Sequence, residues 1–280
     1  MLNSLHQGNK VKQSQVLSTI LAACRRRIEE ARAAVPLEKL APEAEECTDH
    51  RDFASAISGE NLCVIAELKK ASPSRGVMRP DFQPVEIAKS YQQAGAAALS
   101  VLTEEQFFQG SLEDLKMARE AVRLPVLRKD FIIDDYQVYE SAAAGADAIL
   151  LIVAALDDSG LRRFLALAEQ LRVAALVEVH TEEELDRAIA AGARIIGVNN
   201  RDLDTLEVDM ETSIRLRGKI PPSCIAVSES GIKSGGDLER LARAGFNAVL
   251  IGEHFMLAED PGKELARLLK SAPALKPARV

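Results

Sequence analysis

The chain has 280 residues, 47% of them hydrophobic, and a formal net charge of −7, so it can bury a large core. Its acidic balance argues against nucleic acid as a partner, and the absence of an apolar run of roughly 20 residues argues against a membrane span. Four scattered cysteines without a CxxC pair are typical of a reducing compartment, which predicts a cytoplasmic location.

The chain divides into four segments. Residues 1–14 are polar and are predicted to be a disordered extension, and residues 273–280 are predicted to be a flexible tail. The segment 15–50 is predicted to be a helical extension, because apolar residues recur at helical spacing between Leu17 and Ala31. Such an amphipathic helix could plug one end of a barrel or roof an active site, and periodicity alone does not decide between these two positions. Residues 51–272 form the main domain.

A short phrase centred on Ala-Gly occurs four times in this domain, at Gly95, Gly145, Gly192 and Gly245. Each copy ends a helical pattern and opens an apolar, strand-like run, because glycine accepts the left-handed backbone that terminates a helix. The copies are about 50 residues apart, long enough for two strand-plus-helix units each. Four such steps predict eight units, the number that closes a (β/α)8 barrel.

The predicted strands are continuous apolar runs, as expected for parallel strands that are buried on both faces. In chain order the predicted strands are 64–66, 99–102, 126–127, 148–153, 175–179, 195–198, 225–227 and 249–251. The helices predicted to follow them are 84–94, 111–122, 135–144, 158–171, 181–191, 210–217, 237–244 and 262–269. We therefore expect an α/β fold, a single TIM barrel with an extra N-terminal helix. An open doubly wound sheet would normally carry a Gly-rich turn after its first strand, and residues 69–76 lack that pattern.

Catalytic groups of such barrels project from the carboxyl ends of the strands. Glu67 and Lys69 end the first strand, Lys129 the third and Glu178 the fifth. Glu67 and Lys69 alone could be a rim ion pair, but two carboxylates and two ammonium groups at one barrel mouth are costly to desolvate. We therefore favour a functional interpretation of the set. His180 precedes a helix, and we interpret it as an ordinary loop residue.

Small residues follow the last two strands, as Ser230-Gly231 and Gly252-Glu253. Barrels of this class often bind phosphate there through backbone N–H groups. The pattern therefore predicts a phosphorylated small-molecule substrate. Because the carboxylate of Glu253 would repel a phosphate, we expect its backbone N–H to make the contact.

Five stretches match one known family in content and in order: 65–74 with IAELKKASPS, 102–111, 128–131 with RKDF, 197–203 with GVNNRDL, and 228–232 with SESGI. Together they resemble the indole-3-glycerol-phosphate synthases of tryptophan biosynthesis, from about residue 17 to residue 269. The resemblance implies a carboxy-lyase that closes the ring of 1-(2-carboxyphenylamino)-1-deoxyribulose 5-phosphate with loss of CO2 and water. It implies no cofactor, and the four histidines lack metal-ligand spacing, so we expect no metal. Contact with other enzymes of that pathway stays open.

The resemblance also implies roles for individual residues. Lys129 would be the general acid that protonates the ketone, Glu178 would assist dehydration, and Lys69 would hold or protonate the substrate. Glu67 and Asn199 would position the hydroxyls and the lysines. The implied substrate contacts are Arg201 near the carboxylate, Phe108 and Phe131 against the ring, and Ser72, Ser230, Gly231, Gly252 and Glu253 at the phosphate.

Two alternatives stay open at this point. One is another phosphosugar barrel, such as an isomerase or an aldolase that uses Lys129 as a Schiff-base nucleophile. The other is a non-catalytic barrel that serves as a scaffold, which the set of four charged strand-end residues disfavours. The chain also departs from many family members in having Arg75 in place of Lys and Glu253 in place of Ser, and the second departure puts a side-chain contact to phosphate in doubt.

Overall fold

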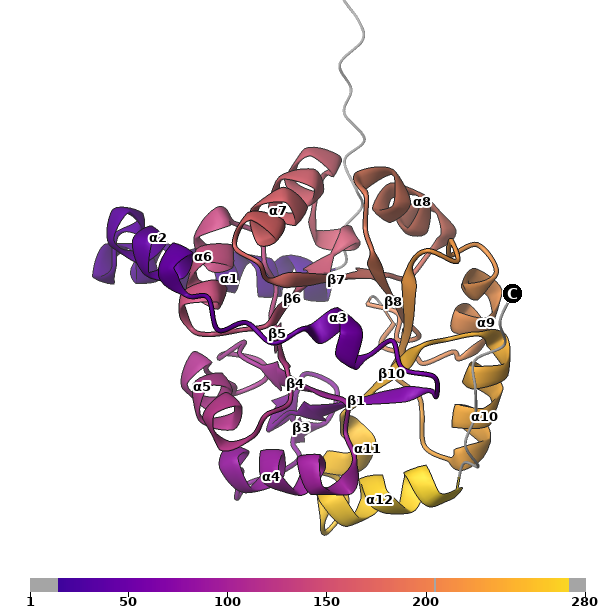
Figure 1. Cartoon of the computed structure of the whole chain (residues 1–280). Coiled ribbons are helices and arrows are strands. Elements are labelled where there is room, and N and C mark those ends of the chain that lie inside the picture. The colour runs from indigo at the N-terminus through magenta and orange to yellow at the C-terminus, as the bar shows by residue number, and fades with distance from the viewer. Residues whose placement is uncertain (1–14, 204, 272–280) are drawn as a thin grey trace, which may run out of the picture.

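Eight parallel strands close into a barrel in the spatial order β1-β10-β9-β8-β7-β6-β5-β4 (Figure 1). The computed structural model describes residues 15–203 and 205–271, so the predicted N-terminal extension 1–14 and tail 273–280 lie outside the described residues. The barrel strands are β1 (Cys63–Leu68), β4 (Ala98–Leu102), β5 (Val126–Lys129), β6 (Ala148–Ile152), β7 (Ala174–Val179), β8 (Ile195–Asn199), β9 (Ile225–Glu229) and β10 (Ala248–Ile251). The predicted barrel fold is confirmed.

Helices surround the barrel and alternate with its strands (Figure 1). They are α4 (Pro84–Ala94), α5 (Leu112–Ala121), α6 (Asp135–Ala143), α7 (Asp158–Gln170), α8 (Glu182–Ala191), α9 (Glu211–Arg217), α10 (Gly235–Ala244) and α12 (Pro261–Ser271). The glycines of the repeated phrase have φ of +97°, +81°, +91° and +93°, in the left-handed region that the sequence predicted for them. The phrase therefore marks where each of four helices gives way to a strand.

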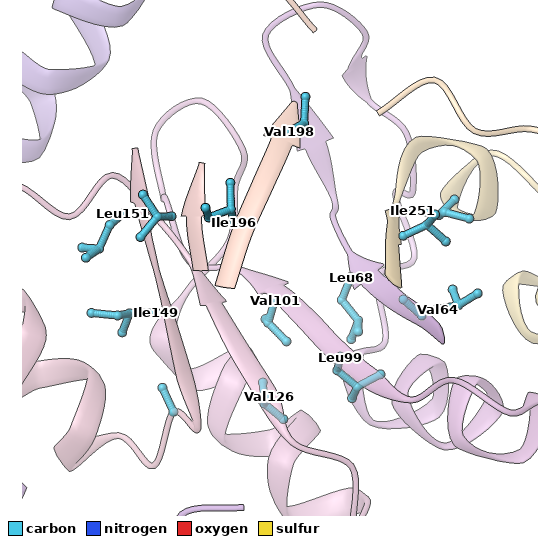
Figure 2. Packing of buried hydrophobic residues seen from close by; sticks show 14 of the residues in the cluster. Val64, Leu68, Leu99, Val101, Val126, Ile149, Leu151, Ile196, Val198 and Ile251 are labelled. Carbon is cyan, nitrogen blue, oxygen red and sulfur yellow. The ribbon is translucent and has the colours of Figure 1, made fainter. Parts of the chain in front are cut away.

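Two apolar clusters hold the barrel together. One lies between the outer faces of the strands and the helices, where Val64, Leu99 and Ile149 belong to the same packed layer (Figure 2). The other fills the barrel interior, and it includes Phe53 and Ile57 from the segment before β1. Because both faces of each strand are buried, the strands read as continuous apolar runs rather than as alternating ones.

The N-terminal segment contributes three helices, α1 (Gln15–Ala34), α2 (Leu37–Glu46) and α3 (Phe53–Ala56). Val16, Leu17 and Ile20 of α1 line the cavity at the carboxyl ends of the strands, so α1 roofs the barrel mouth rather than plugging the opposite end. In Figure 1, α3 crosses the near end of the barrel and α1 lies behind it. The periodicity predicted α1, and α2 lies within the segment 15–50 that was predicted to be helical, whereas α3 was not predicted.

The sequence also did not predict the 3-10 turn η1 (Val153–Ala155), the short helix α11 (Glu253–Met256) or the small hairpin of β2 (Ala71–Ser72) and β3 (Gly76–Val77). The hairpin follows β1, and α11 follows β10, so both add to the loops around the barrel mouth. Among the described residues, no helix is both long enough and apolar enough to cross a bilayer.

Candidate active site

All of the predicted site residues line one cavity of about 470 Å³ at the carboxyl ends of the barrel strands. They come from separate strands and loops, and only closure of the barrel brings them together. They are Glu67, Lys69, Ser72, Phe108, Lys129, Phe131, Glu178, Asn199, Arg201, Ser230, Gly231, Gly252 and Glu253. The arrangement places charged groups and an apolar wall around a space large enough for a small organic ligand.

Lys69 and Glu67 form a close ion pair, with 2.8 Å between Nζ and Oε1. The side chain of Glu67 is 4% exposed and that of Lys69 is 15% exposed, so the pair lies inside the cavity rather than on a solvated rim. Gly252 makes room for it, since a Cβ atom at that position would collide with the Glu67 carboxylate. Gly252, which the sequence assigns to phosphate binding, therefore also leaves the space that the Glu67 carboxylate occupies.

Lys129 faces two buried carboxylates. Its Nζ atom is 3.5 Å from Oε2 of Glu178 and 3.3 Å from Oε2 of Glu229. Burial alone would lower the pKa of Lys129, but the charges of Glu229, Glu178 and Glu67 outweigh it and raise the pKa above its ordinary value. The ammonium form of Lys129 is therefore the dominant one at neutral pH, which is the state that a general acid needs.

Glu229 is a site residue that the sequence reasoning missed. It ends β9 opposite Asn199, and Gly197 leaves the space that its carboxylate occupies, since a Cβ at that glycine would collide with it. Burial and the neighbouring charge of Glu178 raise the pKa of Glu229 to about 8, although Lys129 opposes the shift. The only signal in the sequence was its place at a strand end inside the motif SESGI.

Glu178 is in the opposite state. Burial alone would raise its pKa, but Lys129 and His180 outweigh it, and the pKa of Glu178 is lowered below its ordinary value. Two neighbouring carboxyl groups thus have pKa values pushed in opposite directions, as is common where one group is kept as a base and its neighbour holds a proton. The two carboxyl groups therefore differ in their affinity for a proton, and Glu229 binds one more readily than Glu178 does.

Asn199 organises the loop after β8. Its Oδ1 atom accepts hydrogen bonds from Oγ of Ser230 at 2.8 Å and from the backbone N–H of Arg201 at 3.1 Å. Ser230 and Gly231 both have left-handed backbones, with φ of +67° and +86°. A non-glycine residue rarely adopts that conformation, and such residues are common at functional turns. The amide of Asn199 therefore fixes the turn that the sequence assigned to phosphate.

Glu253 contacts two arginines at the cavity edge. Its carboxylate lies 3.0 Å from the guanidinium of Arg201 and 3.1 Å from that of Arg75. Arg201 also donates to the backbone oxygen of Leu206 at 3.0 Å. From the sequence we expect the Glu253 carboxylate to repel a phosphate. The two guanidinium groups reduce that repulsion, because they offset the negative charge of the carboxylate.

An apolar wall faces the charged groups. The rings of Phe108 and Phe131 lie with centroids 6.3 Å apart and tilted by 40°, a geometry that suits aromatic packing. The roof helix α1 is tied to this wall, since Sγ of Cys24 donates to the backbone oxygen of Phe131 at 3.1 Å and Arg27 pairs with Asp130 at 2.8 Å. The wall and the roof give the cavity an apolar side.

His180 is more than the loop residue that the sequence suggested. Its side chain is 10% exposed, with Nε2 3.4 Å from Oε1 of Glu178 and Nδ1 3.1 Å from Oε2 of Glu184. The Glu184 carboxylate also accepts a hydrogen bond from the backbone N–H of His180. Among the described residues, no cluster of three potential metal ligands occurs.

Comparisons with known proteins agree on one family. Residues 17–268 match the family model described as indole-3-glycerol phosphate synthase. A protein of that name from Polaromonas naphthalenivorans is 51% identical over 91% of this chain and 98% of its own length. Another, from Chloroherpeton thalassium, is 54% identical over 87% of this chain and 95% of its own length.

Among solved structures, thiamine phosphate pyrophosphorylase from Pyrococcus furiosus superposes with a TM-score of 0.58 over 75% of this chain and 95% of that chain. The two sequences are 18% identical, so this likeness supports the barrel fold alone.

Proposed function

This chain belongs to the indole-3-glycerol phosphate synthase family, and from that premise we propose how its barrel mouth closes the indole ring. The enzyme is a carboxy-lyase of tryptophan biosynthesis. It converts 1-(2-carboxyphenylamino)-1-deoxyribulose 5-phosphate into indole-3-glycerol phosphate and releases CO2 and water. The contact of Lys129 with Glu178 and Glu229 is the observation that carries the assignment of the site.

Lys129 is the acid of ring closure. The ring carbon that bears the carboxylate attacks the ketone carbon, a carbon–carbon bond forms, and the electron pair of the carbonyl moves to oxygen. Lys129 donates a proton to that oxygen, and CO2 then leaves so that the ring regains its aromaticity. Support comes from the three carboxyl groups that hold Lys129 in its ammonium form before the substrate arrives.

Glu178 is the base of dehydration. Loss of the new hydroxyl group requires an acid on the oxygen and a base for the proton of the adjacent carbon in the five-membered ring. The lowered pKa of Glu178 keeps a carboxylate available for that proton. We assign Lys69, paired with Glu67 at 2.8 Å, to hold the substrate and to protonate the leaving hydroxyl.

The remaining lining residues bind the substrate. Phe108 and Phe131 pack against its aromatic ring, and Arg201 lies at the edge where the carboxylate of that ring would enter. We place the phosphate at the turns after β9 and β10, where small residues and left-handed backbone let an anion approach backbone N–H groups. The phosphate contacts are Ser72, Ser230, Gly231, Gly252 and the backbone of Glu253.

A Schiff-base mechanism is disfavoured by the same geometry. A lysine that acts as a nucleophile needs a neutral amine, which usually requires a lowered pKa. The carboxyl groups around Lys129 raise its pKa instead. Borohydride treatment in the presence of substrate therefore should leave no covalent adduct, and a stable adduct on Lys129 would refute its role as an acid.

Replacement of Lys129 tests the proposal. We expect Lys129→Ala to lower kcat by roughly 10²- to 10⁴-fold, the usual contribution of a positioned general acid. The variant should keep the circular dichroism spectrum of the parent, because Lys129 faces the cavity. Lys263→Ala is the matched control, since Lys263 pairs with Asp260 on the surface. Near-normal turnover by folded Lys129→Ala protein would contradict the assignment.

We also propose that the protein is cytoplasmic. All four cysteines are free thiols, which fits the cytoplasm.

A further inference from the structure

The imidazole ring of His180 lies between two carboxylates of different elements. One is Glu178 on β7, which lines the cavity, and the other is Glu184 in the first turn of α8. His180 itself is not among the residues that line the cavity. It therefore contacts the reacting groups through Glu178 and not through the substrate.

Glu184 is held firmly in place. Its carboxylate accepts the backbone N–H of His180 at 2.7 Å, and its own backbone N–H donates to Oγ1 of Thr181 at 3.2 Å. The same oxygen, Oε2, is the one that meets Nδ1 of the His180 ring at 3.1 Å. The partner that orients the imidazole is thus fixed by the helix cap.

The two ring contacts favour two protons on the imidazole. An ionised carboxylate only accepts hydrogen bonds, so Nδ1 must donate to Glu184. Nε2 lies 3.4 Å from Oε1 of Glu178, and a lone pair there would face a negative oxygen. Nε2 makes no hydrogen bond, so its attraction to Glu178 is electrostatic and is strongest when the ring is an imidazolium.

The surrounding charges favour this form. Burial alone would lower the pKa of His180, but the hydrogen bond to Glu184 and the charges of Glu178, Glu184 and Glu229 raise it above the ordinary value of 6.5. In turn, His180 is one of the cations that lower the pKa of Glu178.

The two oxygens of Glu178 have different partners. Oε2 faces Nζ of Lys129 at 3.5 Å, and Oε1 faces the His180 ring at 3.4 Å. With one cation on each oxygen, the carboxylate is fixed in both charge and orientation. Lys129 donates a proton in the reaction, so its charge changes. His180 takes no part in proton transfer and keeps its charge.

We propose that His180 is a positioning residue, an imidazolium oriented by Glu184 that keeps the Glu178 carboxylate ionised and turned toward Lys129. The inference rests on the role proposed above for Glu178. It predicts that changes at His180 act on kcat and leave KM for the substrate nearly unchanged, because the ring does not line the cavity.

Four variants test it. His180→Asn removes the cation, and Glu184→Gln weakens the orienting contact. Glu183→Gln is the matched control, because it removes the same charge from the same turn of α8 at an exposed position. Glu178→Gln reports on the role of Glu178 itself. We expect kcat to fall on the order of tenfold in His180→Asn, as is typical when the outer partner of a reacting group is lost.

The pH dependence separates a positioning role from a merely structural one. In the parent enzyme, kcat should decline as pH rises through the raised pKa of His180, because the imidazolium is lost. Glu184→Gln should move this decline to lower pH, and His180→Asn should abolish it. The titration of Glu229 occurs in all of these proteins, so the difference between them is the readout. In Glu183→Gln the profile should match the parent.

Nuclear magnetic resonance gives a second readout that does not depend on activity. The chain has four histidines, and the ring signal that is missing in His180→Asn identifies His180. That signal should titrate above 6.5 in the parent and lower in Glu184→Gln. A value at or below 6.5 would overturn the inference. If His180→Asn does not fold, the ring signal that shifts in Glu184→Gln but not in Glu183→Gln identifies His180.

The kinetic outcomes are also distinct. If His180→Asn keeps the kcat and pH profile of the parent while Glu178→Gln is inactive, the inference is wrong and the proposed function stands. If Glu178→Gln is fully active, the proposed role of Glu178 is wrong. Reduced kcat with unchanged KM in His180→Asn, and a shifted profile in Glu184→Gln, would support the inference.

Discussion

At the scale of single residues, the cavity separates its carboxyl groups by environment. Glu178 and Glu229 are both buried beside Lys129, but Glu178 also has His180 beside it. The sequence identified Glu178 as an acidic residue at a strand end. It did not identify Glu229 as a site residue, because the contact of Glu229 with Lys129 crosses the barrel between β9 and β5. That proximity follows from barrel closure and from the space left by Gly197.

The shifted pKa of Glu229 has a consequence for stability. A carboxyl group whose pKa rises from 4.5 in the unfolded chain to about 8 in the folded protein binds more protons when folded over that range. The free energy of unfolding should therefore decrease as pH rises between these values, by at most about 1.4 kcal/mol for each pH unit. In Glu229→Gln this contribution should be absent.

Urea unfolding across that pH range measures the effect. The parent protein should lose stability relative to Glu229→Gln as pH rises, and Glu183→Gln, which removes an exposed carboxylate, should follow the parent. If the parent and Glu229→Gln depend on pH in the same way, the raised pKa of Glu229 is wrong.

At the scale of elements, helix and strand positions were readable wherever a local signal repeated. Ser111 caps α5 and Ser234 caps α10, and Gly192 ends α8 with a left-handed backbone. The short helices α3 and α11 span a single turn each, too short to show a helical period. The role of α1 was also undecided, because its apolar stripe fits either end of a barrel, and only the cavity lining places it at the mouth.

The left-handed glycines provide a test at this scale. We expect Gly192→Ala to lower stability by about 1–2 kcal/mol, since φ there is +91° and a side chain strains that backbone. No atom would contact the added methyl group, so the cost comes from the backbone alone. Gly218→Ala is the matched control, because that glycine also has open space but a φ of −63°. Chemical denaturation measures both.

Two results would bear on this prediction in opposite ways. A loss of stability in Gly192→Ala with none in Gly218→Ala supports the left-handed role of the repeated phrase. Equal stability of the two variants would show that the phrase does not depend on backbone conformation.

At the scale of the whole molecule, the residues that stabilise the barrel and the residues that react lie at opposite ends of the strands. The repeated phrase lies where helices end and strands begin, whereas the reacting groups lie at the other ends of the strands. The eight barrel strands, their order along the chain and the 13 predicted site residues that line the cavity followed from the sequence and from the family resemblance. The coupling of Glu229 and His180 to the site did not, because it depends on distances between strand ends and a helix cap.

The central claim is that this cavity closes the indole ring with Lys129 as the acid. Purified protein supplied with 1-(2-carboxyphenylamino)-1-deoxyribulose 5-phosphate tests it most directly, with indole fluorescence and released CO2 followed together. The account predicts one CO2 for each indole-3-glycerol phosphate formed, and loss of both signals in Lys129→Ala. A folded parent protein that yields neither product would contradict it.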